Sequence, residues 1–243
     1  MALLELRQVT KRFLGITANQ DISFDVEKSE IVGLIGPNGA GKTTLFNCIA
    51  GFYPPSGGRI VFNGEDITGL PAEKVCLKGI ARTFQIVKTF KELTATENVM
   101  VGAFCRTHSP VQAKKKAEEI LEFAGLYDVR HQVAAGLTLA AKKRLEIAKA
   151  IATGPKLIML DEAMAGLNQS ETRDAVELIK NIRGSGLTVL LVEHVMEVVM
   201  PISDRVVVLD YGVKIAEDTP ENIVRNPTVI KAYLGDKAHV ESR

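Results

Sequence analysis

Residues 31–44 read IVGLIGPNGAGKTT, and this stretch decides the fold of the chain. Its first five residues form a short, wholly apolar run, which indicates a buried strand. The following residues fit the pattern G-x-x-x-x-G-K-[ST] at every fixed position, and a helix is expected over residues 42–50, with Gly51 ending it. A glycine-rich turn between a buried strand and a helix predicts a loop that binds phosphate groups.

The residue types of this loop suit the binding of a nucleotide. Glycines let the backbone curl so that several N–H groups point at phosphate oxygens, and the positive N-terminal end of the helix adds to them. Lys42 supplies a cation for the β- and γ-phosphates, and the Thr43 hydroxyl is a ligand for Mg²⁺. The candidate ATP-binding residues are Gly36, Pro37, Asn38, Gly39, Ala40, Gly41, Lys42, Thr43 and Thr44.

A pair of acidic residues follows a second apolar run. Residues 157–160 read LIML, and Asp161 comes at the carboxyl end of this expected strand, where α/β sheets bind ligands. Glu162 comes next and is placed to activate a water molecule as general base. By themselves the two residues could simply cap the next helix. Together with the phosphate-binding loop, they predict a metal ligand and a base.

Hydrophobic periodicity outlines the rest of the chain. It predicts strands at residues 3–9, 22–26, 59–62, 188–192 and 206–209, and helices at 113–124, 139–152 and 171–183. Residues 210–212 are typical of a hairpin turn, and residues 220–234 of two short helices broken at Pro227. These features predict an α/β fold with a mainly parallel sheet, in which the first two strands form an antiparallel edge and the middle helices are an insertion.

Composition narrows the class of protein. The chain has 243 residues, of which 46% are hydrophobic and 24% charged, so it has the composition of a folded globular protein. The formal net charge of +1 argues against a nucleic-acid binder that works by bulk electrostatics. We expect no transmembrane helix, no export signal and no metal site at Cys48, Cys76 and Cys105, whose spacing matches no metal pattern.

The motifs and their order along the chain resemble those of the ATP-binding subunits of ABC transporters. The resemblance covers essentially the full length of the chain. Phe13 lies where that family stacks an aromatic side chain on adenine. Gln85 matches the glutamine that contacts Mg²⁺ and the attacking water, and His194 matches the switch histidine. The resemblance therefore implies an ATP hydrolase with Glu162, His194 and Gln85 as catalytic residues. It implies Mg²⁺ held by Thr43, Gln85 and Asp161.

The same resemblance implies an architecture. It is that of a RecA-like P-loop NTPase core with a mainly parallel sheet, an antiparallel β subdomain and an inserted helical subdomain. We expect a single ABC ATPase domain over residues 1–243. Within it, residues 1–84 and 156–243 would form the nucleotide-binding core, and residues 85–155 approximately would form the helical subdomain.

Within the family, four stretches look like the branched-chain amino acid uptake group: residues 79–85, 97–99, 164–168 and 226–235. This likeness implies two membrane-spanning permease subunits, a second ATPase subunit, a periplasmic or extracellular solute-binding protein, and a peripheral place on the cytoplasmic face of the inner membrane. Importers of urea or amides and lipid exporters share the catalytic residues and stay open as alternatives. Soluble ABC ATPases of DNA repair or translation, which carry coiled-coil insertions or two units per chain, fit less well.

The sequence departs from the family at its signature motif, L-S-G-G-Q. The aligned residues 137–141 read LTLAA, so both glycines and the glutamine are missing. The family uses this loop to donate N–H groups to the γ-phosphate bound on the other subunit, which makes Thr138 and Ala140 candidate contacts. The backbone N–H groups at a helix N-terminus can donate hydrogen bonds whether or not the residues are glycine, and Thr138 can cap this helix. Each Cβ, however, limits how closely the loop can approach the phosphate. The alternative is that this face has lost its catalytic role.

Overall fold

The computed structural model describes residues 2–193 and 196–234, which fall into two compact units. Unit 1 comprises Met1–Ala72 together with Leu190–Arg243, and unit 2 comprises Glu73–Val189. The division into a core of residues 1–84 and 156–243 and a helical subdomain of residues 85–155 remains a prediction, because compactness alone does not define a functional subdomain.

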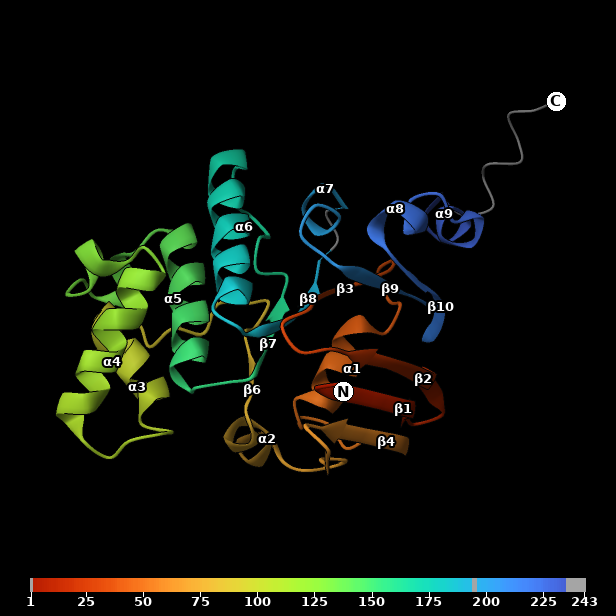
Figure 1. Cartoon of the computed structure of the whole chain (residues 1–243), viewed down its shortest axis with the longest axis horizontal. Coiled ribbons are helices and arrows are strands. Elements are labelled where there is room, and N and C mark those ends of the chain that lie inside the picture. Colours follow the sequence, from red (N-terminus) through yellow and green to blue (C-terminus); the bar gives the residue numbers. More distant parts are fainter. Residues whose placement is uncertain (1, 194–195, 235–243) are drawn as a thin grey trace. The chain divides into compact units, whose positions relative to one another are not determined.

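Unit 1 contains an antiparallel sheet with the strand order β2-β1-β4-β5 (Figure 1). Its strands are β1 (Leu4–Phe13), β2 (Ile16–Val26), β4 (Gly57–Phe62) and β5 (Glu65–Asp66). Leu4 and Leu6 of β1 are fully buried, whereas the intervening Glu5 is not. The antiparallel pairing of β1 with β2, with Leu4 opposite Val26, is as predicted. The two strands are not an edge of the parallel sheet, however, because they belong to this separate antiparallel sheet with β4 and β5.

The apolar run before the phosphate-binding loop is strand β3 (Ile31–Ile35), and all five of its residues are buried. Strand β3 pairs in parallel with β9 (Arg205–Asp210), which in turn pairs antiparallel with β10 (Val213–Asp218). Helix α1 (Lys42–Ile49) begins directly after the loop. Strands of a parallel sheet are buried on both faces, which explains why residues 31–35 form a continuous apolar run.

The C-terminal part of unit 1 also carries short helices. It contains α7 (Met196–Val199), α8 (Pro220–Ile223) and α9 (Pro227–Leu234). The two predicted short helices broken at Pro227 are therefore confirmed.

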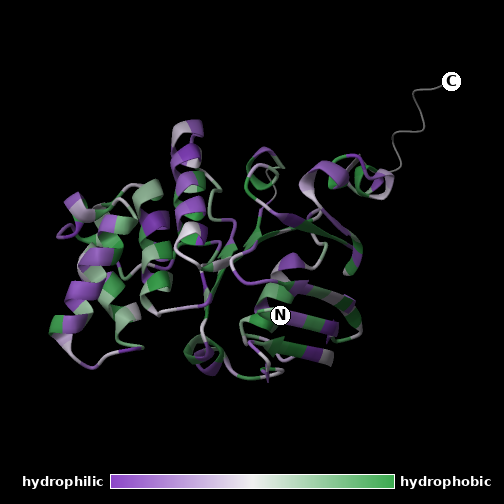
Figure 2. Cartoon of the chain, in the orientation of Figure 1, coloured by the Kyte–Doolittle hydropathy of each residue, from purple (hydrophilic) through white to green (hydrophobic). Residues whose placement is uncertain are grey.

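Unit 2 is built around three mutually packed helices, α3 (Ala95–Ala103), α4 (Pro110–Phe123) and α5 (Leu139–Ala152) (Figure 1). They enclose a core of small and branched apolar side chains, and the hydrophilic residues of α4 alternate with hydrophobic ones along its length (Figure 2). Side-chain caps fix where these helices begin: Thr94 starts α3, Ser109 starts α4 and Thr138 starts α5.

The remaining elements of unit 2 carry the acidic pair. Strand β6 (Ile80–Arg82) pairs in parallel with β7 (Leu157–Asp161), after which comes α6 (Gln169–Gly184). Helix α2 (Ala72–Lys78) precedes β6, and β8 (Thr188–Val192) leads the chain from unit 2 into unit 1. None of the helices among the described residues is long and apolar enough to cross a lipid bilayer.

Candidate functional site

The phosphate-binding loop of unit 1, residues 36–43, has the tight curl that its glycines predict. Gly36, Gly39 and Gly41 have φ angles of +150°, +82° and +94°, in the region that favours glycine. Space is also limiting: a Cβ on Gly36 would lie 2.1 Å from the carbonyl oxygen of Leu209, and one on Gly41 would lie 2.4 Å from that of Ala18. Both positions therefore require glycine for the loop to close against its neighbours.

Two neighbouring segments hold this loop in place. The fully buried Asn19 of β2 donates a hydrogen bond from Nδ2 to the Gly41 carbonyl oxygen at 3.1 Å. From the turn between β9 and β10, the Gly212 N–H donates to the Ala40 carbonyl oxygen at 3.2 Å. The Gln20 N–H donates to Gly212 at 2.8 Å, which ties the turn to β2. The loop is thus braced from two sides before any nucleotide arrives.

Lys42 points its ammonium group back over the loop. Nζ donates to the carbonyl oxygens of Gly36 at 2.6 Å and Pro37 at 2.9 Å, and the residue is buried. Among the other predicted phosphate contacts, Asn38, Gly39 and Thr43 are exposed, Thr44 is half-buried and Ala40 is buried. Asn38 and Gly39 precede α1 and Thr43 lies in its first turn, where the helix dipole favours an anion.

The C-terminal helix reaches the same loop. Tyr233 of α9 is hydrogen-bonded to the backbone of Gly36. Burial raises the pKa of Tyr233 to about 12, and the hydrogen bond with Gly36 partly opposes this rise. The first glycine of the loop therefore contacts a residue nearly 200 positions away in the sequence.

Phe13, the predicted adenine-stacking residue, ends β1 with a partly exposed ring. Tyr53 meets this ring edge-on, with the ring centroids 5.3 Å apart and an interplanar angle of 82°. The Lys11 ammonium lies 4.7 Å from the Phe13 centroid and also donates to the Pro54 carbonyl oxygen at 2.8 Å. These contacts orient the Phe13 ring without burying it, so that it can stack on a planar ligand.

In unit 2, Asp161 ends β7 and is almost completely buried. Its Oδ2 accepts a hydrogen bond from Nη2 of Arg82 at 2.7 Å, and its backbone N–H donates to the Thr83 hydroxyl at 3.2 Å. Oδ1 of Asp161 is buried and has no hydrogen-bond partner. A buried carboxylate oxygen without a partner suits a hard divalent cation such as Mg²⁺, which takes one or two carboxylates and completes its shell with water and phosphate.

The structure brings Glu162 and Gln85 together. Nε2 of Gln85 donates to Oε2 of Glu162 at 2.7 Å, and Nζ of Lys143 donates to the Glu162 carbonyl oxygen at 2.9 Å. Glu162 has a φ of +47°, which is strained for a residue with a Cβ. The lysine contact stabilises this conformation, which turns the Glu162 side chain toward Gln85.

The segment that carries Gln85 is fixed to α5 by one buried carboxylate. Glu146 is 3% exposed, and its two oxygens accept hydrogen bonds from the backbone N–H groups of Phe84 at 3.0 Å and Lys88 at 3.4 Å. Burial raises the pKa of Glu146, and burial lowers that of Lys149 nearby. Gln85 thus lies between Phe84 and Lys88, whose backbone N–H groups both donate to Glu146 of α5, the helix that begins within the altered signature.

Comparisons with known proteins identify the family. A family model described as "ABC transporter" matches residues 19–165, and one described as "Branched-chain amino acid ATP-binding cassette transporter" matches residues 213–239. This chain belongs to the ATP-binding proteins of ABC transporters. The predictions of an ABC-type ATP hydrolase and of a P-loop NTPase fold are thereby confirmed.

Individual relatives cover nearly the whole of this ABC protein. The high-affinity branched-chain amino acid transport ATP-binding protein BraF of Pseudomonas aeruginosa is 44% identical over 96% of this chain and 98% of its own length. LivG of Escherichia coli, with the same description, is 41% identical over the same shares.

Solved structures of ATP-binding cassettes are similar to this ABC protein in fold. A nucleotide-free cassette is 31% identical with a TM-score of 0.89, covering 97% of this chain and 100% of that one. A cassette in its ADP conformation is 32% identical with a TM-score of 0.88 and the same coverage. A dimeric cassette bound to ADP and Pi is 25% identical with a TM-score of 0.81, covering 89% of this chain and 98% of that one.

The altered signature of this ABC protein has a regular helix start. Thr138 caps α5, its hydroxyl accepting from the Ala141 N–H at 3.2 Å, and none of residues 137–141 has a positive φ. The backbone therefore has no conformation here that demands glycine. Leu139 is exposed, and one of its methyl carbons would lie 3.2 Å from a Cβ placed on Gly166, so the stretch of residues 164–168 lies beside the altered signature.

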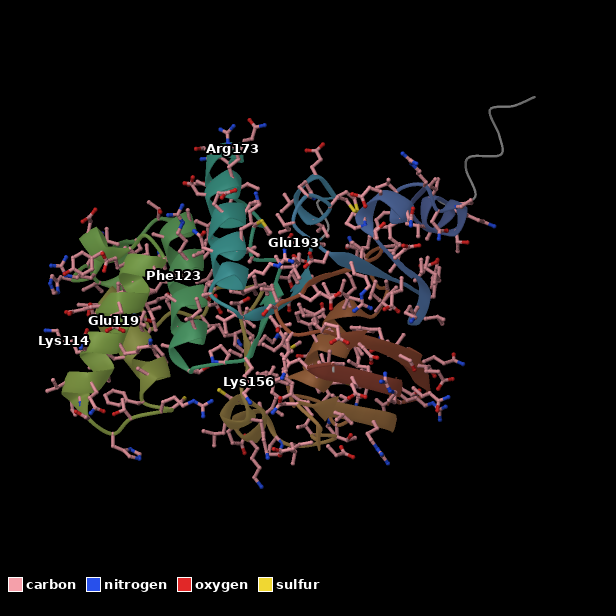
Figure 3. All side chains as sticks on the ribbon, in the orientation of Figure 1. Lys114, Glu119, Phe123, Lys156, Arg173 and Glu193 are labelled. Carbon is pink, nitrogen blue, oxygen red and sulfur yellow. The ribbon has the colours of Figure 1, made fainter. Side chains whose placement is uncertain are left out.

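Several residues that support the predicted site residues are not themselves predicted as site residues from the sequence. Asn19, Tyr53, Arg82, Lys143 and Glu146 acquire their contacts only through packing of distant segments, and the charged ones on α5 look like part of a solvated face. His194, the predicted switch histidine, lies outside the described residues. The residue before it, Glu193, is buried directly after β8 (Figure 3).

Proposed function

We propose that this chain binds and hydrolyses Mg²⁺-ATP to power an importer of branched-chain amino acids or related small solutes. The solute class rests on the relatives' descriptions and on the family model over residues 213–239. None of the residues that we assign to nucleotide chemistry would touch the solute, so its identity depends on the partner proteins.

The residues of the chain take separate roles in this reaction. Lys42 exchanges its two carbonyl acceptors for oxygens of the β- and γ-phosphates, while the N–H groups of the loop bind the remaining oxygens. Phe13 stacks on adenine. Mg²⁺, when bound, balances phosphate charge, and Thr43, Asp161 and Gln85 would hold it directly or through water.

The contact between Glu162 and Gln85 carries the catalytic assignment. A carboxylate held by one amide keeps its other oxygen available to a water molecule. As that water attacks the γ-phosphorus, its proton passes to Glu162 and the bond from the γ-phosphorus to the bridging oxygen of ADP breaks. We assign His194 the family's switch role, as the resemblance implies.

The partners follow from the same proposal. A second ATPase subunit would close head to tail on this chain, with Thr138 and Ala140 facing the γ-phosphate bound by the partner. The cassette dimer among the similar structures supports the pairing of two ATPase subunits. Two permease subunits would hold the pair on the cytoplasmic face of the membrane, and a solute-binding protein would act through them. No nucleic acid is involved.

The decisive experiment is Glu162→Gln in the reconstituted transporter. This variant should bind Mg²⁺-ATP as wild type does but hydrolyse it about 10²–10⁴-fold more slowly, because the general base is lost. Glu177→Gln, which changes an exposed glutamate on α6 in the same way, is the matched control. Turnover of the Glu162 variant within threefold of wild type would exclude this carboxylate as the base.

A further inference from the structure

A buried ion pair links the ends of two strands in unit 2. The side chains of Arg82 and Asp161 are 7% and 2% exposed, and Nη2 lies 2.7 Å from Oδ2. The parallel register of β6 and β7 places Arg82 beside Met159, two residues before Asp161. The strands thus hold the two charges next to each other through regular backbone pairing.

The two oxygens of Asp161 are in different situations. Oδ2 is engaged by Arg82, whereas Oδ1 is buried without a hydrogen-bond partner. A buried carboxylate oxygen is costly to leave unsatisfied, so this arrangement is stable only because the guanidinium compensates the charge, or because a ligand completes it. The backbone of Asp161 is fixed as well, through its N–H bond to the Thr83 hydroxyl.

We propose that Arg82 is a positioning residue for the divalent cation of this ATPase: it holds Oδ2 of Asp161 and so directs Oδ1 toward the metal. The inference rests on the proposed function, which makes Asp161 a metal ligand. The guanidinium is itself placed by Phe84, whose ring centroid lies 5.4 Å from its central carbon. Partners behind a metal ligand fix its orientation in this way in many metal sites.

Two roles of Arg82 would have opposite consequences. If the arginine only competed with the cation for Asp161, removing it would tighten metal binding. If it orients the carboxylate, removing it leaves a buried group free to turn, and metal binding weakens. Loss of such a positioning partner typically lowers metal affinity about 10–100-fold.

The test measures the metal's contribution to nucleotide binding, without turnover. A fluorescent ADP analogue is titrated into the full chain with Mg²⁺ and again with EDTA. The quantity compared between variants is the Kd in EDTA divided by the Kd in Mg²⁺, which measures how much the metal strengthens nucleotide binding. For Arg82→Gln we expect this ratio to fall about tenfold or more, while the Kd in EDTA stays within about threefold of wild type. Arg59→Gln, which breaks an exposed ion pair with Asp66, is the matched control and should change neither value.

Arg82→Lys keeps the experiment decisive if Arg82→Gln does not fold. Lysine retains the cation but not the planar fork, so we expect its ratio to fall by about threefold. An unchanged ratio in the folded variants, or a ratio that rises, would overturn the positioning role. Wild-type chain that binds no nucleotide in EDTA or in Mg²⁺ would instead contradict the proposed function, and with it this inference.

Discussion

Replacing Glu146 with alanine should release the segment that carries Gln85. The change removes the acceptor for the N–H groups of Phe84 and Lys88, at 3.0 and 3.4 Å. The shorter bond to a charged acceptor contributes about 1.5–3 kcal/mol and the longer one about 0.5–1 kcal/mol. Removing a buried charge recovers about 1 kcal/mol of its desolvation cost. The expected net loss of stability is therefore about 1–3 kcal/mol.

Amide hydrogen exchange measures this loss of stability directly at the N–H groups of Phe84 and Lys88. A loss of that size corresponds to exchange about 5–150-fold faster at Phe84 and Lys88 if local opening limits exchange. Glu146→Gln keeps one acceptor and should lose less protection. Glu119→Ala, at an exposed position of α4, is the control. If both amides in Glu146→Ala stayed as protected as in wild type, the carboxylate would not be the anchor.

Three further predictions concern nucleotide binding, the signature and pH. Lys42→Ala should lose about tenfold or more in affinity for a fluorescent ATP analogue, since a charge-assisted phosphate contact disappears; unchanged affinity would refute the assignment of the loop. Changing Leu139 and Ala140 to glycine should raise ATP turnover of the reconstituted complex if their side chains crowd the partner's nucleotide, and no gain would mean that the altered signature works as it is. The raised pKa of Tyr233 means that the folded state favours the neutral phenol. The contribution of Tyr233 to stability is therefore lost as pH rises from 10 to 12, and urea unfolding of Tyr233→Phe should show a smaller loss over this range than wild type.

The phosphate-binding loop and the strand before Asp161 could be predicted because their information is local. The loop has fixed residues at fixed spacing, and the strands on either side are short apolar runs. Helix ends were less well predicted: the third predicted helix, residues 171–183, is Gln169–Gly184 in the structure, because the capping box of Asn168 and Glu171 starts it earlier. That box is visible in the sequence and was the missed signal.

The contacts that hold the site could not be predicted in this way. Glu146 and Arg82 each meet a partner more than 60 residues away, and neither hydrophobic periodicity nor spacing encodes such a pairing. A glutamate on an amphipathic helix is expected to face solvent, because most glutamate side chains in proteins are exposed. Only the fold reveals that this one faces two backbone N–H groups.

The bracing of the phosphate-binding loop by Asn19 and Gly212 has a kinetic consequence. Ordering a loop of this kind costs about 1–2 kcal/mol per residue of chain entropy, and here the folding of unit 1 has already met that cost. An arriving nucleotide therefore finds its N–H groups aligned and loses less of its binding free energy to rearranging the protein. We therefore expect that exchange of spent nucleotide for fresh does not wait for the loop to refold in each transport cycle.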